Sequence, residues 1–338
     1  MMEHKYPFSP GPYNQITDVN GLTIGEAHDE KTATGVTVFL FEEPATASVC
    51  FAGGGPANRD TACLEPDAAV ETIDALVLSG GSGFGLDAAS GVQAWLRENN
   101  RGLPVGPVKV PIVPQAIIFD LLNGGNKEWG RFPPYRELAY EAACRTGRTV
   151  TQGSAGAGFG ATTVNFKGGS GSTSIRTPSG FTIGAYAVVN SLSSAVIGNG
   201  PYFWAAPYEL NGEFGGLGMP ASFEPDDIKI DWKGKSFATT IAVLATDARL
   251  TKAQAKRLSI AAQGGLAKAL RLSHGFMDGD TLFFISTGKK NLTDIAHQMT
   301  ELGSLASDCL ARSVARGVFE ASSLPFQDAQ KSWKDVFG

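Results

Sequence analysis

Residues 237–247 read Phe-Ala-Thr-Thr-Ile-Ala-Val-Leu-Ala-Thr-Asp, a pair of threonines followed by a short apolar run. The run 241–245 is too short to span a membrane and is typical of a strand buried on both faces. Thr239 and Thr240 therefore lie where that strand begins. A threonine there becomes a nucleophile if the preceding peptide bond is cut, because the freed α-amine has a pKa near neutrality and serves as the general base. Threonine is also a common strand residue, so the rest of the chain must decide between these interpretations.

About forty residues later the chain reads Met-Asp-Gly-Asp-Thr at 277–281. Asp278 and Asp280 flank Gly279, so both carboxylates can approach one site from a single tight turn. There they could hold a substrate ammonium or orient the nucleophile. An Asp-Gly-Asp segment is also a common turn without catalytic function.

The regions around these motifs predict strand, helix, strand, helix from residue 239 onward. Thr251 and Gln254 form a capping box before a first helix, and residues 281–286 are typical of a strand. A second long helix follows from the apolar spacing of Ile295, Met299, Leu302, Ala306 and Cys309. Upstream, 181–189 and 194–197 are predicted strands with Asn190 in the turn between them. The stretch 200–235 has no periodicity and is predicted to be a long loop, and a segment that must be cut is one reason for such a loop.

The composition is that of an ordinary globular protein with 338 residues, 43% hydrophobic and 18% charged, which is enough for a large core. A net charge of −5 with no basic run argues against nucleic acid or an anionic membrane as a partner. The four cysteines show no metal-ligand spacing and indicate reduced, buried thiols in a cytoplasmic protein. The four histidines form no H-x-H or H-E-x-x-H pattern, so neither a metal nor another cofactor is expected.

Glycine is abundant, with 42 residues gathered in clusters between periodic segments. The cluster 80–85 follows a strand-like stretch and precedes a helical pattern, which is the setting of a dinucleotide-binding loop. Gly81-Ser82-Gly83-Phe84-Gly85-Leu86 departs from G-x-G-x-x-G at its last position, and no Walker lysine follows. Ser82 also lacks the spacing of a G-x-S-x-G nucleophile elbow. Nucleotide binding and a serine triad are both disfavoured.

A series of motifs in order along nearly the whole chain resembles one known family. They are Leu-Thr-Ile-Gly at 22–25, Thr-Gly-Val-Thr at 34–37, Leu-Ser-Gly-Gly-Ser-Gly-Phe-Gly-Leu-Asp-Ala-Ala at 78–89, Pro-Ile-Val-Pro at 111–114, Ile-Ile-Phe-Asp at 117–120, Gly-Ala-Gly at 156–158, Lys-Gly-Gly at 167–169, Val-Val-Asn at 188–190, and the two segments quoted above. The sequence resembles the self-processing N-terminal-nucleophile amidases, which include the L-aminopeptidase/D-amidase/D-esterase, the β-peptidyl aminopeptidases and the nylon-oligomer (6-aminohexanoate oligomer) hydrolases. Threonine as nucleophile and Asp-Gly-Asp-Thr are more similar to the nylon-oligomer hydrolases.

The resemblance implies an α/β protein with a four-layer αββα sandwich, folded as a single domain over 1–338. It implies self-cleavage between Ala238 and Thr239 into a large subunit, 1–238, and a small subunit, 239–338. Thr239 would be the nucleophile, Asn190 an oxyanion donor, and Asp278 and Asp280 the site carboxylates. The substrate would be a small linear amide or peptide, and the assembly a homo-oligomer, with a tetramer expected.

Two departures from the family pattern leave alternatives open. The residue before the nucleophile is Ala238, where the nylon-oligomer hydrolases have Asn and other members have Gly, so the chain either tolerates a small residue there or is blocked in processing. An ungapped match places Asn165 where those hydrolases have a catalytic lysine. Lys167 takes that role only with a two-residue shift.

Two other functions remain as alternatives from sequence. One is an acyltransferase of the ornithine acetyltransferase type, which uses the same kind of threonine nucleophile. The other is an unprocessed, non-enzymatic glycine-rich binding protein. Amine acceptors in the assay distinguish the first from a hydrolase, and a denaturing gel that shows only the full-length chain identifies the second.

Overall fold

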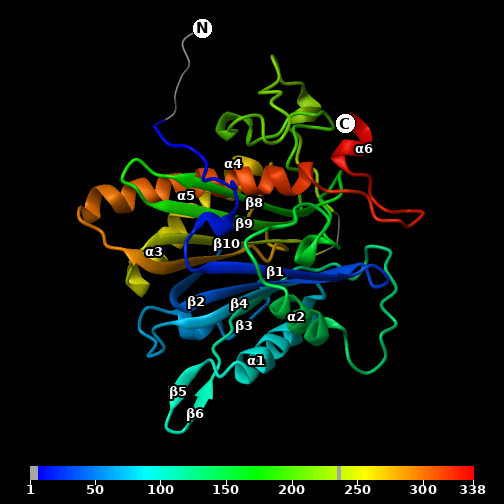
Figure 1. Ribbon diagram of the computed structural model, residues 1–338. Helices are drawn as coiled ribbons and strands as arrows, with labels where there is room; N and C mark the ends of the chain where they lie inside the picture. Colours follow the sequence, from blue (N-terminus) through cyan, green and yellow to red (C-terminus); the bar gives the residue numbers. More distant parts are fainter. Residues whose placement is uncertain (1–6, 234–236) are drawn as a thin grey trace.

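Two stacked β-sheets, each covered on its outer face by helices, make up the computed structural model, which describes residues 7–233 and 237–338 (Figure 1). The first sheet holds β8 (Gly169–Arg176), β9 (Thr182–Asn190), β10 (Thr239–Ala248), β11 (Thr281–Lys290) and the second half of β2 (Thr34–Phe51). The second sheet holds β1 (Leu22–Asp29), the first half of β2, β4 (Ile73–Ser79), β7 (Gln115–Ile117) and β3 (Asn58–Arg59).

The long strand β2 joins the two sheets. Its first half pairs with β1 and β4, and its second half pairs with β11. The pairing register with β4 shifts between Leu40 and Ala45, where Glu42, Glu43 and Pro44 are exposed. Proline has no N–H to donate to a ladder, so it marks the position where the strand passes from one sheet to the other.

Helices of the two outer layers form around these sheets. The first sheet is covered by α3 (Lys252–Ala262), α4 (Gly264–Ala269) and α5 (Ile295–Phe319), and the second by α1 (Ala88–Glu98) and α2 (Tyr135–Cys144) (Figure 1). The remaining helical segments are short: η1 (Ile16–Asp18), η2 (Thr61–Leu64), η3 (Ser82–Asp87), η4 (Gly156–Gly158), η5 (Ala206–Tyr208), η6 (Pro225–Asp227) and α6 (Trp333–Phe337). The predicted capping box is present, with the Thr251 hydroxyl accepting from Gln254 N.

Three apolar layers separate the four layers of secondary structure. One lies between α3–α5 and the first sheet, one between the two sheets, and one between the second sheet and α1–α2. All ten residues of β10 are buried. Ile241 and Val243 face the layer between the sheets, whereas Ala242 and Leu244 face the helices. The four-layer αββα sandwich and the strand buried on both faces are therefore confirmed.

Some local predictions differ from the structure. Residues 194–197 form a turn with one isolated bridge, Val196 to Phe203, instead of a strand. Asn190 is the last residue of β9, so it is on the ladder and not in a turn. The predicted loop 200–235 holds only η5 and η6 as regular structure over its described part, 200–233, and residues 234 and 235 lie outside the described residues. The four cysteines are free, but Cys144 is exposed and only Cys309 is fully buried.

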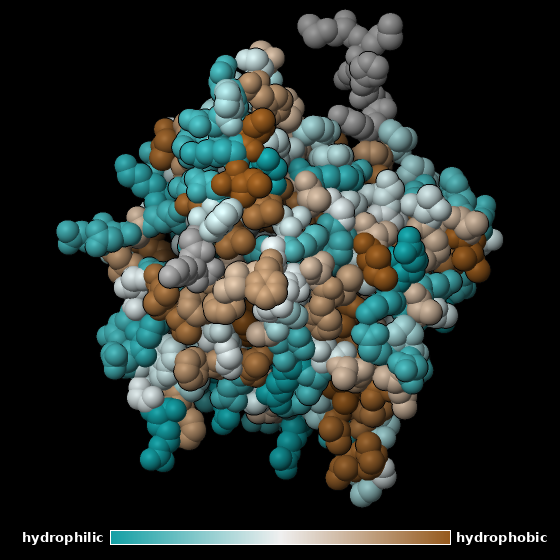
Figure 2. All heavy atoms as spheres, turned by 180° about the vertical axis from the view of Figure 1, so that it is seen from behind, coloured by the Kyte–Doolittle hydropathy of each residue, from teal (hydrophilic) through white to brown (hydrophobic). Residues whose placement is uncertain are grey.

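The hairpin of β5 (Leu103–Val105) and β6 (Val108–Val110) projects beside α1 (Figure 1). Its paired residues place Leu103, Val105, Val108 and Val110 on one face, each 38–55% exposed. In Figure 2 an apolar projection is visible at the lower right. Among the helices that the structure describes, none is long and apolar enough to cross a membrane.

Candidate active site

Thr239 begins β10 at the edge of the first sheet. It pairs with Asn190 of β9, and β10 runs parallel to β11. The Thr239 side chain is buried, and its Oγ1 donates to the carbonyl oxygen of Ala238 at 2.5 Å. The peptide bond between the two residues is intact, so the contacts described below are those of the uncut chain.

The turn before β11 holds the Ala238 peptide from the other side. Gly279 N donates to Ala238 O at 2.9 Å, and Ala238 N donates to Met277 O at 3.3 Å. A Cβ at Gly279 would lie 2.7 Å from Thr239 Oγ1, so glycine is what lets the hydroxyl sit against the turn. The Ala238 carbonyl oxygen therefore accepts two hydrogen bonds, one from a backbone N–H and one from the neighbouring hydroxyl, and both polarise it.

The Asp280 carboxylate fixes the start of the strand. Its Oδ1 accepts from Thr240 N at 2.8 Å, and its Oδ2 accepts from His274 N at 2.8 Å and lies 3.0 Å from His274 Nδ1. The side chain is almost completely buried. Since both oxygens are engaged by these groups, Asp280 acts on Thr239 through the backbone of β10.

Asp278 differs from Asp280, because one of its oxygens has no partner. Its Oδ2 accepts from Gly275 N at 2.9 Å, whereas Oδ1 is buried without a hydrogen bond. Burial, together with the neighbouring charge of Asp280, raises the pKa of Asp278 to about 6. An unpartnered buried carboxylate oxygen costs free energy unless a donor reaches it. Asp278 is thus the carboxylate with free capacity for a ligand.

Asn190 lies opposite Thr239, and its amide group is already engaged. Its Oδ1 accepts from Thr162 N at 3.0 Å, and its Nδ2 donates to Phe119 O at 3.0 Å. The amide of a predicted oxyanion donor is thus held between two loops, with one N–H used by Phe119. The oxyanion role of Asn190 stays a prediction.

The two alternatives for the catalytic lysine position lie before β8. Lys167 is fully buried, and its Nζ donates to Gly158 O at 3.3 Å and Gly168 O at 2.7 Å. Burial lowers its pKa to about 7, although the charge of Asp120 opposes this shift. Asn165 points elsewhere: its Nδ2 donates to Gly198 O at 3.0 Å, in a separate small pocket.

A second lysine, Lys233, reaches the site and was not predicted from the sequence. Its Nζ donates to Thr162 O, to Asn190 Oδ1 at 3.2 Å and to Asn190 O at 3.4 Å. The residue as a whole is half-buried, but its ammonium group is enclosed, which lowers the pKa to about 7 against the attraction of Asp278. The only signal in the sequence is its place six residues before Thr239, in a stretch without periodicity.

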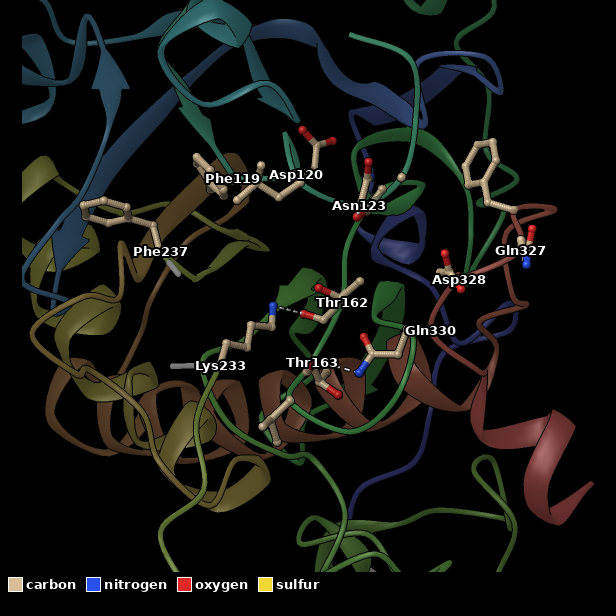
Figure 3. A pocket seen from close by; sticks show the side chains of 15 residues that line it. Phe119, Asp120, Asn123, Thr162, Thr163, Lys233, Phe237, Gln327, Asp328 and Gln330 are labelled. Atoms are coloured by element: carbon tan, nitrogen blue, oxygen red, sulfur yellow. Dashed lines mark hydrogen bonds between the residues drawn. The ribbon is translucent and has the colours of Figure 1, made fainter. Parts of the chain in front are cut away.

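A cavity of 670 Å³ opens beside these groups (Figure 3). Its walls come from the loop after β7, the 160–164 loop, the C-terminal segment and the two residues Lys233 and Phe237; the lining residues are Phe119, Asp120, Leu122, Asn123, Gly124, Gly160, Thr162, Thr163, Val164, Lys233, Phe237, Phe326, Gln327, Asp328 and Gln330. This volume is in the range that holds small ligands. Phe237 stands two residues before Thr239, whereas Thr239 itself is buried and is not among the lining residues.

The glycine cluster at 80–85 has a structural role next to this cavity. Gly81 adopts a positive φ of 86° and its N–H donates to Asp120 Oδ1 at 2.7 Å, while Thr34 Oγ1 donates to Asp120 Oδ2 at 2.6 Å. A Cβ at Gly80 would lie 2.1 Å from the same carboxylate. Burial raises the pKa of Asp120. The glycines thus let the loop close around a buried carboxylate.

Comparison with known proteins agrees with this architecture. The family model described as peptidase family S58 matches residues 14–332. An uncharacterized aminopeptidase of Mycobacterium tuberculosis is 38% identical over 332 residues, which cover 91% of this chain and 94% of that protein. A 6-aminohexanoate-oligomer endohydrolase of Paenarthrobacter ureafaciens is 24% identical over 314 residues, covering 87% and 82%.

A solved structure shows the same fold. The L-aminopeptidase D-Ala-esterase/amidase of Ochrobactrum anthropi, described as a variant of the N-terminal-nucleophile hydrolase fold, superposes with a TM-score of 0.69 at 21% identity over 96% of this chain and 92% of that one. The resemblance drawn from the motifs is confirmed, and the alternative of a non-enzymatic binding protein is wrong. The chain belongs to peptidase family S58 and is an amide hydrolase with the N-terminal-nucleophile hydrolase fold.

Proposed function

We propose that the chain cuts itself between Ala238 and Thr239 and that Thr239 is the nucleophile of both the cut and the later turnover. The observation that carries this proposal is the double hydrogen bond on Ala238 O, from Thr239 Oγ1 at 2.5 Å and from Gly279 N at 2.9 Å. The hydroxyl is adjacent to the carbonyl that it would attack, and a preorganised N–H already faces the oxygen on which negative charge develops.

In the self-cleavage, Thr239 Oγ1 forms a bond to the carbonyl carbon of Ala238, and the C–N bond between the residues breaks. The hydroxyl proton ends on the leaving nitrogen, which becomes the α-amine of Thr239. Water then hydrolyses the resulting ester, leaving a carboxylate on Ala238 and restoring the Thr239 hydroxyl. The products are a large subunit, 1–238, and a small subunit, 239–338.

In turnover, the free α-amine of Thr239 takes the hydroxyl proton as Oγ1 attacks a substrate amide, and an acyl-enzyme forms. The substrate is a small linear amide or peptide with a free amino end, as the names of the aminopeptidase and 6-aminohexanoate-oligomer relatives suggest. Asp278 carries the unpartnered carboxylate oxygen that suits such an ammonium. Asp280 positions the strand, and Asn190 is the proposed oxyanion donor.

For the position of the catalytic lysine, Lys167 is a better candidate than Asn165. The Lys167 ammonium is buried, and Gly169, two residues later, pairs with Val189, which precedes the partner of Thr239 on β9. Its role would be to add positive charge that lowers the pKa of the new α-amine. The Asn165 amide is held by Gly198 O in another pocket.

Intact mass and N-terminal sequencing of the freshly purified protein test the proposal. We expect a fragment of 100 residues that begins Thr-Thr-Ile, the length from position 239 to 338. A new N-terminus elsewhere would remove Thr239 as the nucleophile. An intact 35.4 kDa chain that hydrolyses an amino-acid anilide would remove self-cleavage from the mechanism.

We further infer a cytoplasmic homo-oligomer, with a tetramer as the specific expectation. Free cysteines support a reducing compartment, and the exposed apolar face of the β5–β6 hairpin supports contact between copies. Light scattering after size exclusion tests the assembly, since a monomeric mass at micromolar concentration contradicts it. Fractionation of the source cells tests the compartment.

A further inference from the structure

The ammonium of Lys233 points toward Thr162 at one side of the active-site cavity (Figure 3). Its acceptors are Thr162 O, Asn190 Oδ1 and Asn190 O. The charge of Asp278 also attracts this ammonium, but from beyond direct contact. We call this set of oxygens on Thr162 and Asn190 the oxygen recess.

The chemistry of the oxygen recess selects a primary ammonium. Such a group has three donors on a compact charge and no acceptor, which matches a recess that offers only acceptors. A quaternary ammonium has no N–H to donate. A guanidinium presents its donors in a planar fork instead of converging on a point.

The segment that carries Lys233 is held to the rest of the protein by a few hydrogen bonds. It has no regular structure from 228 to 233, and Ile228, Ile230 and Trp232 are 50–61% exposed. The Arg271 guanidinium donates to Ile228 O, with Nε at 3.1 Å. The hydrogen bond from Lys233 N to Leu192 O, at 3.2 Å, is its nearest backbone tie. Burial of the Lys233 ammonium lowers its pKa to about 7, so placing the charged group in the recess costs desolvation free energy.

Lys233 precedes the Ala238 carboxyl end by five residues. In the uncut chain β10 holds this end, because Ala238 is bonded to Thr239 and to the turn at 277–279. A cut at that bond removes the covalent tie. The described part of the segment, 228–233, is then held by the bonds at Ile228 O and Lys233, and it gains conformational entropy when these are released.

We propose that the oxygen recess is a subsite for a primary alkylammonium, that Lys233 fills it in the uncut chain, and that self-cleavage empties it for the amino end of the substrate. This inference rests on the proposed function and specifies which groups of the same site bind the substrate. Lys233 therefore blocks the cavity until the nucleophile has formed.

The first test uses a chain that cannot cut itself, so it does not depend on activity. In the Thr239→Ala background, Lys233→Ala removes the ammonium and leaves room for n-propylammonium, which reproduces the missing part of the side chain. We expect n-propylammonium to raise the melting temperature of this double variant and to bind it at least about tenfold more tightly than it binds Thr239→Ala alone, the effect of one charge-assisted hydrogen bond.

Matched controls separate the subsite from general effects of the amine. Lys229→Ala removes an exposed lysine of the same segment, and tetramethylammonium carries the charge without N–H groups. Neither should reproduce the stabilisation. Lys233→Met fills the site with an apolar side chain and should bind n-propylammonium no better than Thr239→Ala. If Lys233→Ala does not fold, Lys233→Ser with ethylammonium takes its place, and the same tenfold difference is expected. Equal binding by Thr239→Ala and by the Lys233→Ala double variant would overturn the subsite.

The second test examines release. The processed protein with Lys233 intact should bind n-propylammonium as tightly as the uncut Lys233→Ala double variant does. If the double variant binds and the processed protein does not, Lys233 stays in place after the cut and the release is refuted. If no cut occurs at 238–239, the proposed function and the release both fail, while the first test still decides whether the subsite exists.

Discussion

Replacing Gly279 by alanine tests whether the position of the Thr239 hydroxyl controls self-cleavage. An added Cβ would lie 2.7 Å from Thr239 Oγ1, 3.2 Å from Thr239 Cγ2 and 2.9 Å from Gly55 O. Ordinary contacts begin at 3.4 Å, so the hydroxyl must retreat by roughly 0.7 Å or turn to another rotamer. A misplacement of about 1 Å in a reacting group costs about 10²-fold in rate. We therefore expect cleavage to slow about 100-fold.

The fold should survive this substitution. The backbone of Gly279 does not adopt a positive φ, and its N–H still donates to Ala238 O in the alanine variant. Overpacking at one position typically costs about 1–3 kcal/mol.

The assay follows the appearance of the 239–338 fragment by denaturing gel and mass spectrometry, with urea unfolding as the measure of stability. Gly147→Ala is the matched control, since a Cβ at Gly147 meets nothing within 4 Å. Cleavage of Gly279→Ala at the rate of the control, with equal stability, would refute the assigned geometry.

The further predictions concern single side chains. Thr239→Ala should abolish both self-cleavage and amide hydrolysis, while the free energy of unfolding changes by only about 1 kcal/mol. Thr240 lies on the opposite face of β10, so Thr240→Ala should retain a measurable part of both activities in the same gel and anilide assays. Between pH 7 and pH 10.5, Lys167 is protonated in the unfolded chain but not in the folded chain. The free energy of unfolding of the parental protein should therefore rise with pH across this window. Lys167→Met should reduce this rise, as measured by urea unfolding at pH 7 and pH 10. Asp280→Asn should slow self-cleavage and lower the free energy of unfolding by about 1–3 kcal/mol, because an amide cannot accept from both Thr240 N and His274 N. Asp278→Asn should instead raise KM for amino-terminated substrates more than for their N-acylated forms. Equal effects on both substrates would contradict an ammonium contact.

The elements that the sequence predicts well are those whose environment is uniform along their length. β10 is apolar on both faces because it lies between two cores, and α5 repeats its apolar residues at helical spacing against the first sheet. The capping box at Thr251 and Gln254 is a local interaction within four residues. In each case the interactions that form the element are between residues close in sequence, so the sequence pattern predicts the element without the tertiary structure.

The features that the sequence misses depend on partners far apart in the chain. Residues 194–197 have the composition of a strand, but only one residue there has a bridge partner, so the backbone turns instead. The sequence predicts a turn at Asn190, because nothing local shows that Thr239 extends the ladder by one more pair. Lys233 lies in a stretch without periodicity, and its acceptors on Thr162 and Asn190 precede it by 71 and 43 residues.

In the uncut chain the donor to the carbonyl oxygen that is attacked is Gly279 N, whereas the family resemblance implies Asn190 as the oxyanion donor in turnover. Ala238 O accepts from Gly279 N, whereas the Asn190 amide donates to Phe119 O and accepts from Lys233 and Thr162 N. The Asn190 Nδ2 group has a second N–H beside the one that bonds Phe119 O, so it could donate to a substrate oxyanion while Asn190 Oδ1 stays in the oxygen recess. Gly279 N would thus serve the self-cleavage, and Asn190 the later turnover. A single cleavage would create the α-amine base and empty the oxygen recess, so hydrolysis of other amides cannot precede maturation.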